Sequence, residues 1–274
     1  MASLKDLQNF SSDLPGQSER MPALFIGHGS PMNGIEDNPF SQSWSALGKS
    51  VATPAAVLCI SAHWLTEGTH VTAMEHPRTI HDFYGFPQAL FNVQYPAPGS
   101  PELAKATAAQ VKKTSIGMDH EWGLDHGTWS VVRQMYPEAN VPVLQLSIDY
   151  ARPATYHYEL ARELSALRSK GVLIIGSGNM VHNLRMLNWR EPQGGFDWAI
   201  EMNETFKNLI RKDDHTALMN YEKLGPAAKL SIPTPDHYYP LIYTLGLKEK
   251  GESVEIFNDT LTMGSVSMTS LRIS

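Results

Sequence analysis

Three histidines along this chain follow, or nearly follow, short apolar segments, and a fourth lies in a proline-rich stretch. His28 comes directly after the run ALFIG, and His63 comes directly after AAVLCISA. His182 lies shortly beyond VLIIG, and His237 lies in the proline-rich stretch PTPDHYYP. Neutral imidazoles are the commonest protein ligands of Zn, Fe, Cu and Ni, and three or four of them with an open coordination position are typical of a catalytic metal site. These four side chains are therefore candidate ligands of one ion.

The placement of these histidines favours a shared site. Ligands of open α/β sheets bind beyond the carboxyl ends of the strands, so imidazoles at several strand ends would face one crevice. Gly27 and Gly29 flank His28, and glycine lets the backbone turn sharply enough for an imidazole to reach over the sheet edge. The stretch GHGSPMNG matches neither GxGxxG nor GxxxxGK[ST], so nucleotide binding is not indicated. From these residues alone, the alternative of separate structural histidines stays open.

Two carboxylates stand beside histidines. Asp236 precedes His237 and could orient a metal-bound imidazole through a hydrogen bond, the usual second contact of such a ligand. Asp125 precedes His126 in the stretch GLDHGTW. His126 could serve as an acid, a base or a hydrogen-bond donor to a substrate. Equally, Asp125 could cap the helix that follows, with His126 on its exposed first turn.

The remaining residues of reactive type have other expected places. Cys59 lies within an apolar run and is expected in the core. GSGN is not the GxSxG motif of serine hydrolases, so Ser177 is expected to cap the turn that carries His182. His81, in an aromatic loop, is expected to line the pocket. Five further histidines in polar surroundings are predicted to lie on the surface: His70, His76, His120, His157 and His215.

Composition and charge exclude several classes of protein. The chain has 274 residues, a net charge of −6 and one cysteine, so it has no basic footprint for nucleic acid, no internal disulfide and no four-cysteine zinc site. No run reaches the 18 or so apolar residues of a membrane helix. The first residues lack a basic region followed by an apolar one, so we expect a cytoplasmic protein. Residues 1–20 are polar and are predicted to form a flexible N-terminal segment.

Alternating strand-like and helix-like segments indicate the fold class. They predict one α/β domain over residues 21–274, with a central, mainly parallel sheet flanked by helices. Two long loops, at residues 76–101 and 230–240, are of the kind that often carries function. The predicted strands are residues 23–26, 55–61, 141–148, 172–176, 254–257 and 266–273, and the predicted helices are residues 101–113, 154–169 and 198–212.

Taken in order, the motifs of the chain resemble those of the LigB-type extradiol ring-cleaving dioxygenases. The resemblance is strongest to the small single-chain branch of that family, the 4,5-DOPA dioxygenases. It extends over most of the chain and implies a three-layer α/β domain with a central mixed sheet. The motifs that carry it are MPALFIGHGSPMN, ISAHW, TIHDFYGFP, YPAPGSPELA, GLDHGTW, QLSID, GSGNMVHN, PTPDHYYPL and MGSVSM.

The resemblance implies roles for individual residues. His28, His63 and His237 would be metal ligands, although the larger LigB enzymes use a carboxylate where His237 stands. His182 would be either a fourth ligand or an acid/base beside the metal, and His126 would contact the substrate. Such a site implies non-haem Fe(II) for turnover, while an all-histidine set would also retain Zn(II) in the isolated protein.

The implied reaction opens a catechol ring with O2 and gives a muconate semialdehyde. It requires a proton acceptor, for which His182 and His126 are both candidates. Phe83 and Tyr84, in the loop at residues 76–101, are expected to stack on the catechol. The other possibility for these rings is that they only anchor the loop.

Two other functions are compatible with the residues. The same histidines could hold zinc in a hydrolase, activating water rather than binding a catechol. A non-enzymatic interaction protein with a vestigial metal site is the second alternative. The expected partners for the dioxygenase are a small catechol and O2, with no nucleic acid and no membrane.

Overall fold

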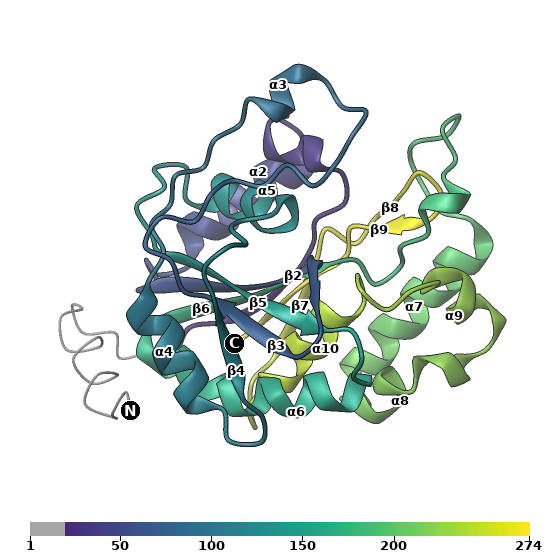
Figure 1. The fold of residues 1–274 in the computed structure, drawn as a ribbon. Coiled ribbons are helices and arrows are strands. Elements are labelled where there is room, and N and C mark those ends of the chain that lie inside the picture. Colours follow the sequence, from purple (N-terminus) through teal and green to yellow (C-terminus); the bar gives the residue numbers. More distant parts are fainter. Residues whose placement is uncertain (1–19) are drawn as a thin grey trace.

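Eight strands form one mixed sheet at the centre of the molecule (Figure 1). The computed structural model describes residues 20–274, so the predicted flexible segment at residues 1–20 lies, except for residue 20, outside the described residues. The strand order is β4-β3-β5-β2-β6-β1-β10-β7. The strands are β1 Ala23–Gly27, β2 Ala56–Thr66, β3 Thr69–Thr72, β4 Ile116–Asp119, β5 Val143–Asp149, β6 Val172–Gly178, β7 Val254–Phe257 and β10 Ser270–Ile273, and a separate ribbon pairs β8 Leu261–Thr262 with β9 Val266–Ser267.

The four inner strands, β5, β2, β6 and β1, are parallel to one another, and antiparallel pairing begins at β3 and at β10. Their side chains are apolar on both faces because both faces are covered. In β1, Phe25 packs into the core on one side of the sheet, and Leu24 and Ile26 pack into the core on the other. Two separate cores therefore lie on the two faces of one sheet, which confirms the predicted three-layer α/β fold.

Helices cover both faces. In Figure 1, α2 and α5 lie on one side of the sheet, and α6 and α10 lie on the other. Among residues 20–274, none of the helices is both long enough and apolar enough to cross a bilayer. The α-helices are α2 Pro39–Ser50, α3 Gln88–Phe91, α4 Pro101–Gln110, α5 His126–Met135, α6 Ala154–Leu164, α7 Asp197–Arg211, α8 His215–Met219, α9 Pro226–Ser231 and α10 Tyr239–Gly246, and the 3-10 helices are η1 Pro31–Gly34, η2 Ser165–Lys170, η3 Leu184–Met186 and η4 Tyr221–Leu224.

Two predicted elements are divided in the structure. The strand expected at residues 266–273 consists of β9 and β10, and the hydroxyls of Ser267 and Thr269, at the interruption, both donate to Oδ1 of Asn203. The helix expected at residues 154–169 changes to the 3-10 helix η2 after Leu164 and ends, as predicted, at Gly171, which has a φ of +79°.

Candidate metal centre

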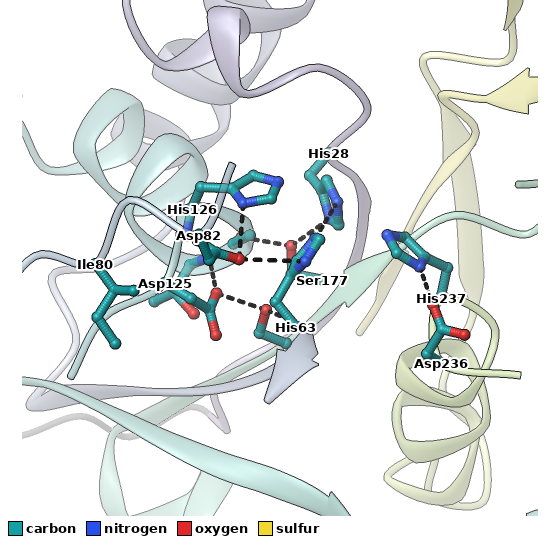
Figure 2. Close-up of polar contacts among 12 residues, drawn as sticks. His28, His63, Ile80, Asp82, Asp125, His126, Ser177, Asp236 and His237 are labelled. Atoms are coloured by element: carbon teal, nitrogen blue, oxygen red, sulfur yellow. Dashed lines mark hydrogen bonds and ion pairs between the residues drawn. The ribbon is translucent and has the colours of Figure 1, made fainter. Parts of the chain in front are cut away.

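Five histidines from distant parts of the chain meet at one edge of the sheet, and Figure 2 shows four of them, His28, His63, His126 and His237. The ring centroids of His28, His63 and His237 form an almost equilateral triangle, with separations of 5.1, 5.4 and 4.9 Å. His182 stacks on His237 at 3.5 Å, and His126 lies 3.9 Å from His63. The structure thus brings together every histidine that the sequence suggested for the metal or the substrate.

The two glycines beside His28 are required by the close approach of another segment. A Cβ atom on Gly27 would lie 2.6 Å from the carbonyl carbon of Met268, and one on Gly29 would lie 2.4 Å from the Met268 sulfur. Gly29 also has a φ of +58°, a conformation that favours glycine. His28 can therefore leave the end of β1 and turn over the sheet edge only because no side chain stands on either side.

His63 reaches the site from within a strand. The sequence placed it after its strand, but β2 continues to Thr66 and includes it. The register between β2 and β5 shifts between Ile60 and Leu65, which marks a bulge around His63. Bulges re-aim a side chain relative to a regular strand, and they are common beside functional sites. Gly127 makes room here, because a Cβ on it would lie 2.9 Å from the His63 ring.

His237 precedes α10 and is anchored through its backbone. Its carbonyl oxygen accepts a hydrogen bond of 2.9 Å from the backbone N–H of Asn179, just after β6. A Cβ on Gly178 would lie 2.2 Å from the same carbonyl oxygen, so this approach depends on glycine at that position. The proline-rich stretch before α10 is thus fastened against the end of β6, and its histidine faces the ends of β1 and β2.

The hydrogen bonds of His28 identify the nitrogen that is free to bind a metal. Ser177 donates its single hydroxyl proton to the carbonyl of Gly127 at 2.5 Å, so its oxygen can only accept from Nδ1 of His28, which lies 3.0 Å away. The proton of His28 is therefore on Nδ1, and Nε2 carries a lone pair. Ser177 is fully buried in this position and is neither a nucleophile nor the predicted cap of the turn that carries His182.

Carboxylates contact the other two members of the triangle. Asp236 accepts a hydrogen bond from Nδ1 of its neighbour His237. Oδ2 of Asp82 lies 3.3 Å from Nδ1 of His63, at ion-pair distance. Each contact holds Nδ1, so the opposite edge of each ring, which carries Nε2, faces the centre of the triangle (Figure 2).

Burial favours the neutral form of His28, His63 and His182. The pKa of His28 and that of His63 are held well below the usual 6.5 by desolvation first, and then by the other histidines of the cluster. The pKa of His182 is lowered for the same reasons, although Asp236 acts in the opposite direction. Metal ligation requires neutral histidine, so the environment prepares these residues to bind a cation at neutral pH.

The spacing of the free nitrogens fits a single ion. Two nitrogens each about 2.1 Å from one tetrahedral ion lie about 3.4 Å apart. Nε2 of His28 and Nε2 of His63 are 3.2 Å apart. Two lone pairs at this distance repel each other unless a cation lies between them. The nitrogens of His28 and His63 therefore fit one bound transition metal, and the His237 ring lies beside them at centroid distances of 5.4 and 4.9 Å.

His182 differs from these three in its orientation. Its ring is stacked on that of His237 at 3.5 Å with an interplanar angle of 10°. The lone pairs of two parallel rings lie in parallel planes, so an ion in the plane of His237 would lie well outside the plane of His182. As placed, His182 stands beside the triangle and not within it.

His126 begins α5, and Asp125 caps that helix. Oδ1 of Asp125 accepts from the backbone N–H of Thr128 at 3.1 Å and from the Ser61 hydroxyl at 2.6 Å. The predicted cap is therefore present, but the first turn is not exposed, since only 6% of His126 is accessible. Burial raises the pKa of the Asp125 carboxyl, and Asp82 raises it further. Asp125 thus caps the helix, and the same helix start brings the His126 ring beside that of His63.

The two aromatic residues predicted to contact the substrate have different positions. The Phe83 ring lies 5.6 Å from His126 in an edge-to-face arrangement and 5.0 Å from Phe91. Tyr84 is 92% exposed and is not brought to the histidines. His81 packs edge-to-face on Phe83 at 5.8 Å and contacts the carbonyl of Val93 at 2.9 Å.

One predicted surface histidine is in the core. His157 is fully buried, and its Nδ1 lies 3.1 Å from the hydroxyl of Tyr243. Its ring also packs against Tyr239 at 4.4 Å. The sequence missed it because its polar neighbours lie on the outer face of α6. His76 and His120 are exposed as predicted, and His70 and His215 are half-buried.

Residues 22–272 match the protein family described as the catalytic LigB subunit of aromatic ring-opening dioxygenase. The chain belongs to the LigB family. Membership confirms the predicted enzyme class, an aromatic ring-opening dioxygenase, and gives no support to a zinc hydrolase or to a non-enzymatic interaction protein.

Similar proteins within and beyond bacteria support this assignment. This LigB-family chain is 48% identical to the 4,5-DOPA dioxygenase extradiol of Escherichia coli K12, over 95% of the chain and 97% of the relative. It is 36% identical to the protein of that name from Beta vulgaris, over 92% of the chain and 96% of that relative. The crystal structure of an uncharacterized protein from Escherichia coli K12 superposes with a TM-score of 0.82 at 43% identity, covering 93% of this chain and 100% of that one.

Proposed function

We propose that this protein is an extradiol dioxygenase that cleaves the ring of a catechol of the 4,5-DOPA type and gives a muconate semialdehyde. The observation that carries the proposal is the triangle of the His28, His63 and His237 rings, in which Nε2 of His28 and Nε2 of His63 lie 3.2 Å apart. The resemblance to relatives named 4,5-DOPA dioxygenase supports the substrate class. Residues 21–274 act as one catalytic domain in this proposal.

The metal would be non-haem Fe(II), held by His28, His63 and His237. These three histidines would hold the ion and would leave coordination positions for the catechol and O2, as oxygenases that use ferrous iron require. Bound there, Fe(II) would supply the redox chemistry between the catechol and O2. The same imidazoles suit zinc, so we expect Zn(II) in protein isolated without added iron.

His182 is the acid/base in this proposal. Its ring lies against His237 and outside the triangle, so its nitrogens are free to exchange a proton with a catechol hydroxyl. Because burial lowers its pKa well below 6.5, it enters the reaction as a neutral base. A proton accepted there can be returned when the ring opens.

His126 contacts the substrate from the other side of His63. With the Phe83 ring beside it, it forms a wall that is partly polar and partly aromatic. An aromatic edge suits a flat catechol ring and excludes water from it. Tyr84 would join this wall only if the loop at residues 76–101 moved toward the histidines.

The test is to load metal-free protein with Fe(II) under anaerobic conditions and then to add O2 and a panel of catechols that includes DOPA. We expect O2 consumption and a yellow semialdehyde whose mass equals that of the catechol plus both oxygen atoms. Zinc-loaded protein is the control and should be inactive. Intradiol products, or turnover that continues without O2, would contradict the proposal.

A further inference from the structure

Asp82 contacts two histidines of different function. Its Oδ2 atom lies 3.0 Å from Nδ1 of His126 and 3.3 Å from Nδ1 of His63, and its Oδ1 atom accepts from the backbone N–H of His126 at 2.9 Å (Figure 2). The carboxylate side chain is 18% exposed. One loop carboxylate therefore joins a candidate metal ligand to the candidate substrate histidine.

These contacts decide where both protons lie. Nδ1 of His126 is buried and makes no hydrogen bond of regular geometry among residues 20–274, and the carboxylate of Asp82, at 3.0 Å, is the charged group that faces it. A carboxylate accepts protons and cannot donate them, so both Nδ1 atoms that face it carry hydrogen. In a neutral imidazole the other nitrogen is then bare. Both Nε2 atoms are therefore acceptors: that of His63 toward the metal and that of His126 toward the substrate.

We propose that Asp82 is a positioning residue that fixes the tautomers of His63 and His126 together, so that His126 accepts the hydrogen bond of a catechol hydroxyl while His63 binds the metal. This inference rests on the proposed function. It narrows the role of His126 from acid, base or donor to hydrogen-bond acceptor.

The same carboxylate links the aromatic loop to the centre. Asp82 precedes Phe83, whose ring packs on His126, so two adjacent residues of the loop contact the same imidazole. The position of this loop and the orientation of His63 are thus coupled through one side chain. Asp82 was not singled out in the sequence, although it stands in the motif TIHDFYGFP.

Charge gives Asp82 a second effect. Imidazole ligands bring no negative charge to a divalent ion, whereas a ligand carboxylate brings one. Asp82 and Asp236 lie directly behind His63 and His237 and place two negative charges around the triangle. A carboxylate behind a histidine raises its basicity as a ligand, and losing such a partner typically costs 10–100-fold in metal affinity.

The test compares Asp82→Asn with Asp82→Glu, and uses Glu75→Gln as a control that removes the same charge from an exposed position near the same loop. Zinc affinity is measured by competition with a chromophoric chelator. The tautomer of His126 is read from the ¹⁵N shifts of histidine-labelled, zinc-loaded protein, with His126→Gln assigning the signal. Circular dichroism confirms that each variant is folded.

In Asp82→Asn, the amide presents a donor where two imidazoles need an acceptor. We expect about a tenfold loss of zinc affinity and loss of the Nδ1–H tautomer at His126. Asp82→Glu should retain the tautomer and regain most of the affinity, and Glu75→Gln should match the wild type. Unchanged affinity and tautomer in Asp82→Asn, or equal behaviour of the Asn and Glu variants, would overturn the inference. None of these measurements requires ring cleavage, so they stand even if the proposed reaction is wrong.

Discussion

His28 and His157 are both buried histidines, yet only one of them belongs to a site. Both are almost inaccessible, and desolvation lowers the pKa of each. His157 is surrounded by tyrosines on α6 and α10, and its Nδ1 contacts the Tyr243 hydroxyl. His28 faces other imidazoles, and its Nε2 lies 3.2 Å from another ring nitrogen.

The difference shows that burial and a lowered pKa do not by themselves identify a functional histidine. A neutral imidazole can be stabilised in the core by stacking and one hydrogen bond, as at His157. Several neutral imidazoles that present lone pairs to each other are unfavourable without a cation. Convergence of unprotonated nitrogens is therefore the property that separates the metal centre from the core histidine.

The largest effect is expected at the metal centre. His28→Ala should reduce Fe(II) and Zn(II) affinity by more than about 100-fold, because even the loss of a residue behind a ligand costs 10–100-fold. Catechol turnover should be lost with it. Metal content after equilibration with a chelator buffer is the measurement. If His28→Ala retained metal as well as His157→Phe does, the two histidines would not differ in metal binding, and the comparison would fail.

The pH dependence of stability tests the core histidine, His157. The pKa of His157 is lowered to about 4 in the folded protein, from a usual 6.5. The unfolded chain then binds more protons between these values, so unfolding free energy falls as pH drops from 6.5 to 4, by about 3 kcal/mol for this residue. Above pH 6.5 the effect is absent. In urea unfolding of metal-free protein, His157→Phe should reduce the pH dependence of the unfolding free energy between pH 4 and 6.5 by the equivalent of about one proton. An unchanged pH dependence would show that His157 titrates normally.

At neutral pH, His157→Phe should lower the unfolding free energy by about 2 kcal/mol, because it leaves the Tyr243 hydroxyl buried without its partner. Stacking on Tyr239 is retained by the new ring. Metal affinity and turnover should not change. A loss of metal binding in this folded variant would mean that α10, which follows His237, transmits the substitution to the centre.

The smallest effect is expected at the hydroxyl behind His28. Ser177→Ala removes the acceptor of the Nδ1 proton and should weaken zinc binding about tenfold. Ser130→Ala is a matched control, since Ser130 is equally buried and its hydroxyl has no hydrogen-bond partner among the described residues. Equal zinc affinities in the two variants, measured by chelator competition, would show that the tautomer of His28 needs no support from Ser177.

The sequence by itself determined the layer architecture, the candidate ligands and the two glycines that free His28. These features depend on residues close in the chain: apolar runs that form strands, and small residues where a strand turns. The tertiary structure decided the rest. It placed His63 on a bulge within β2, His157 in the core and Tyr84 on the surface, and it set Ser177 and Asp82 behind candidate ligands 149 and 19 positions away in the chain. Such partners are chosen by packing between distant segments, so local pattern carries no sign of them.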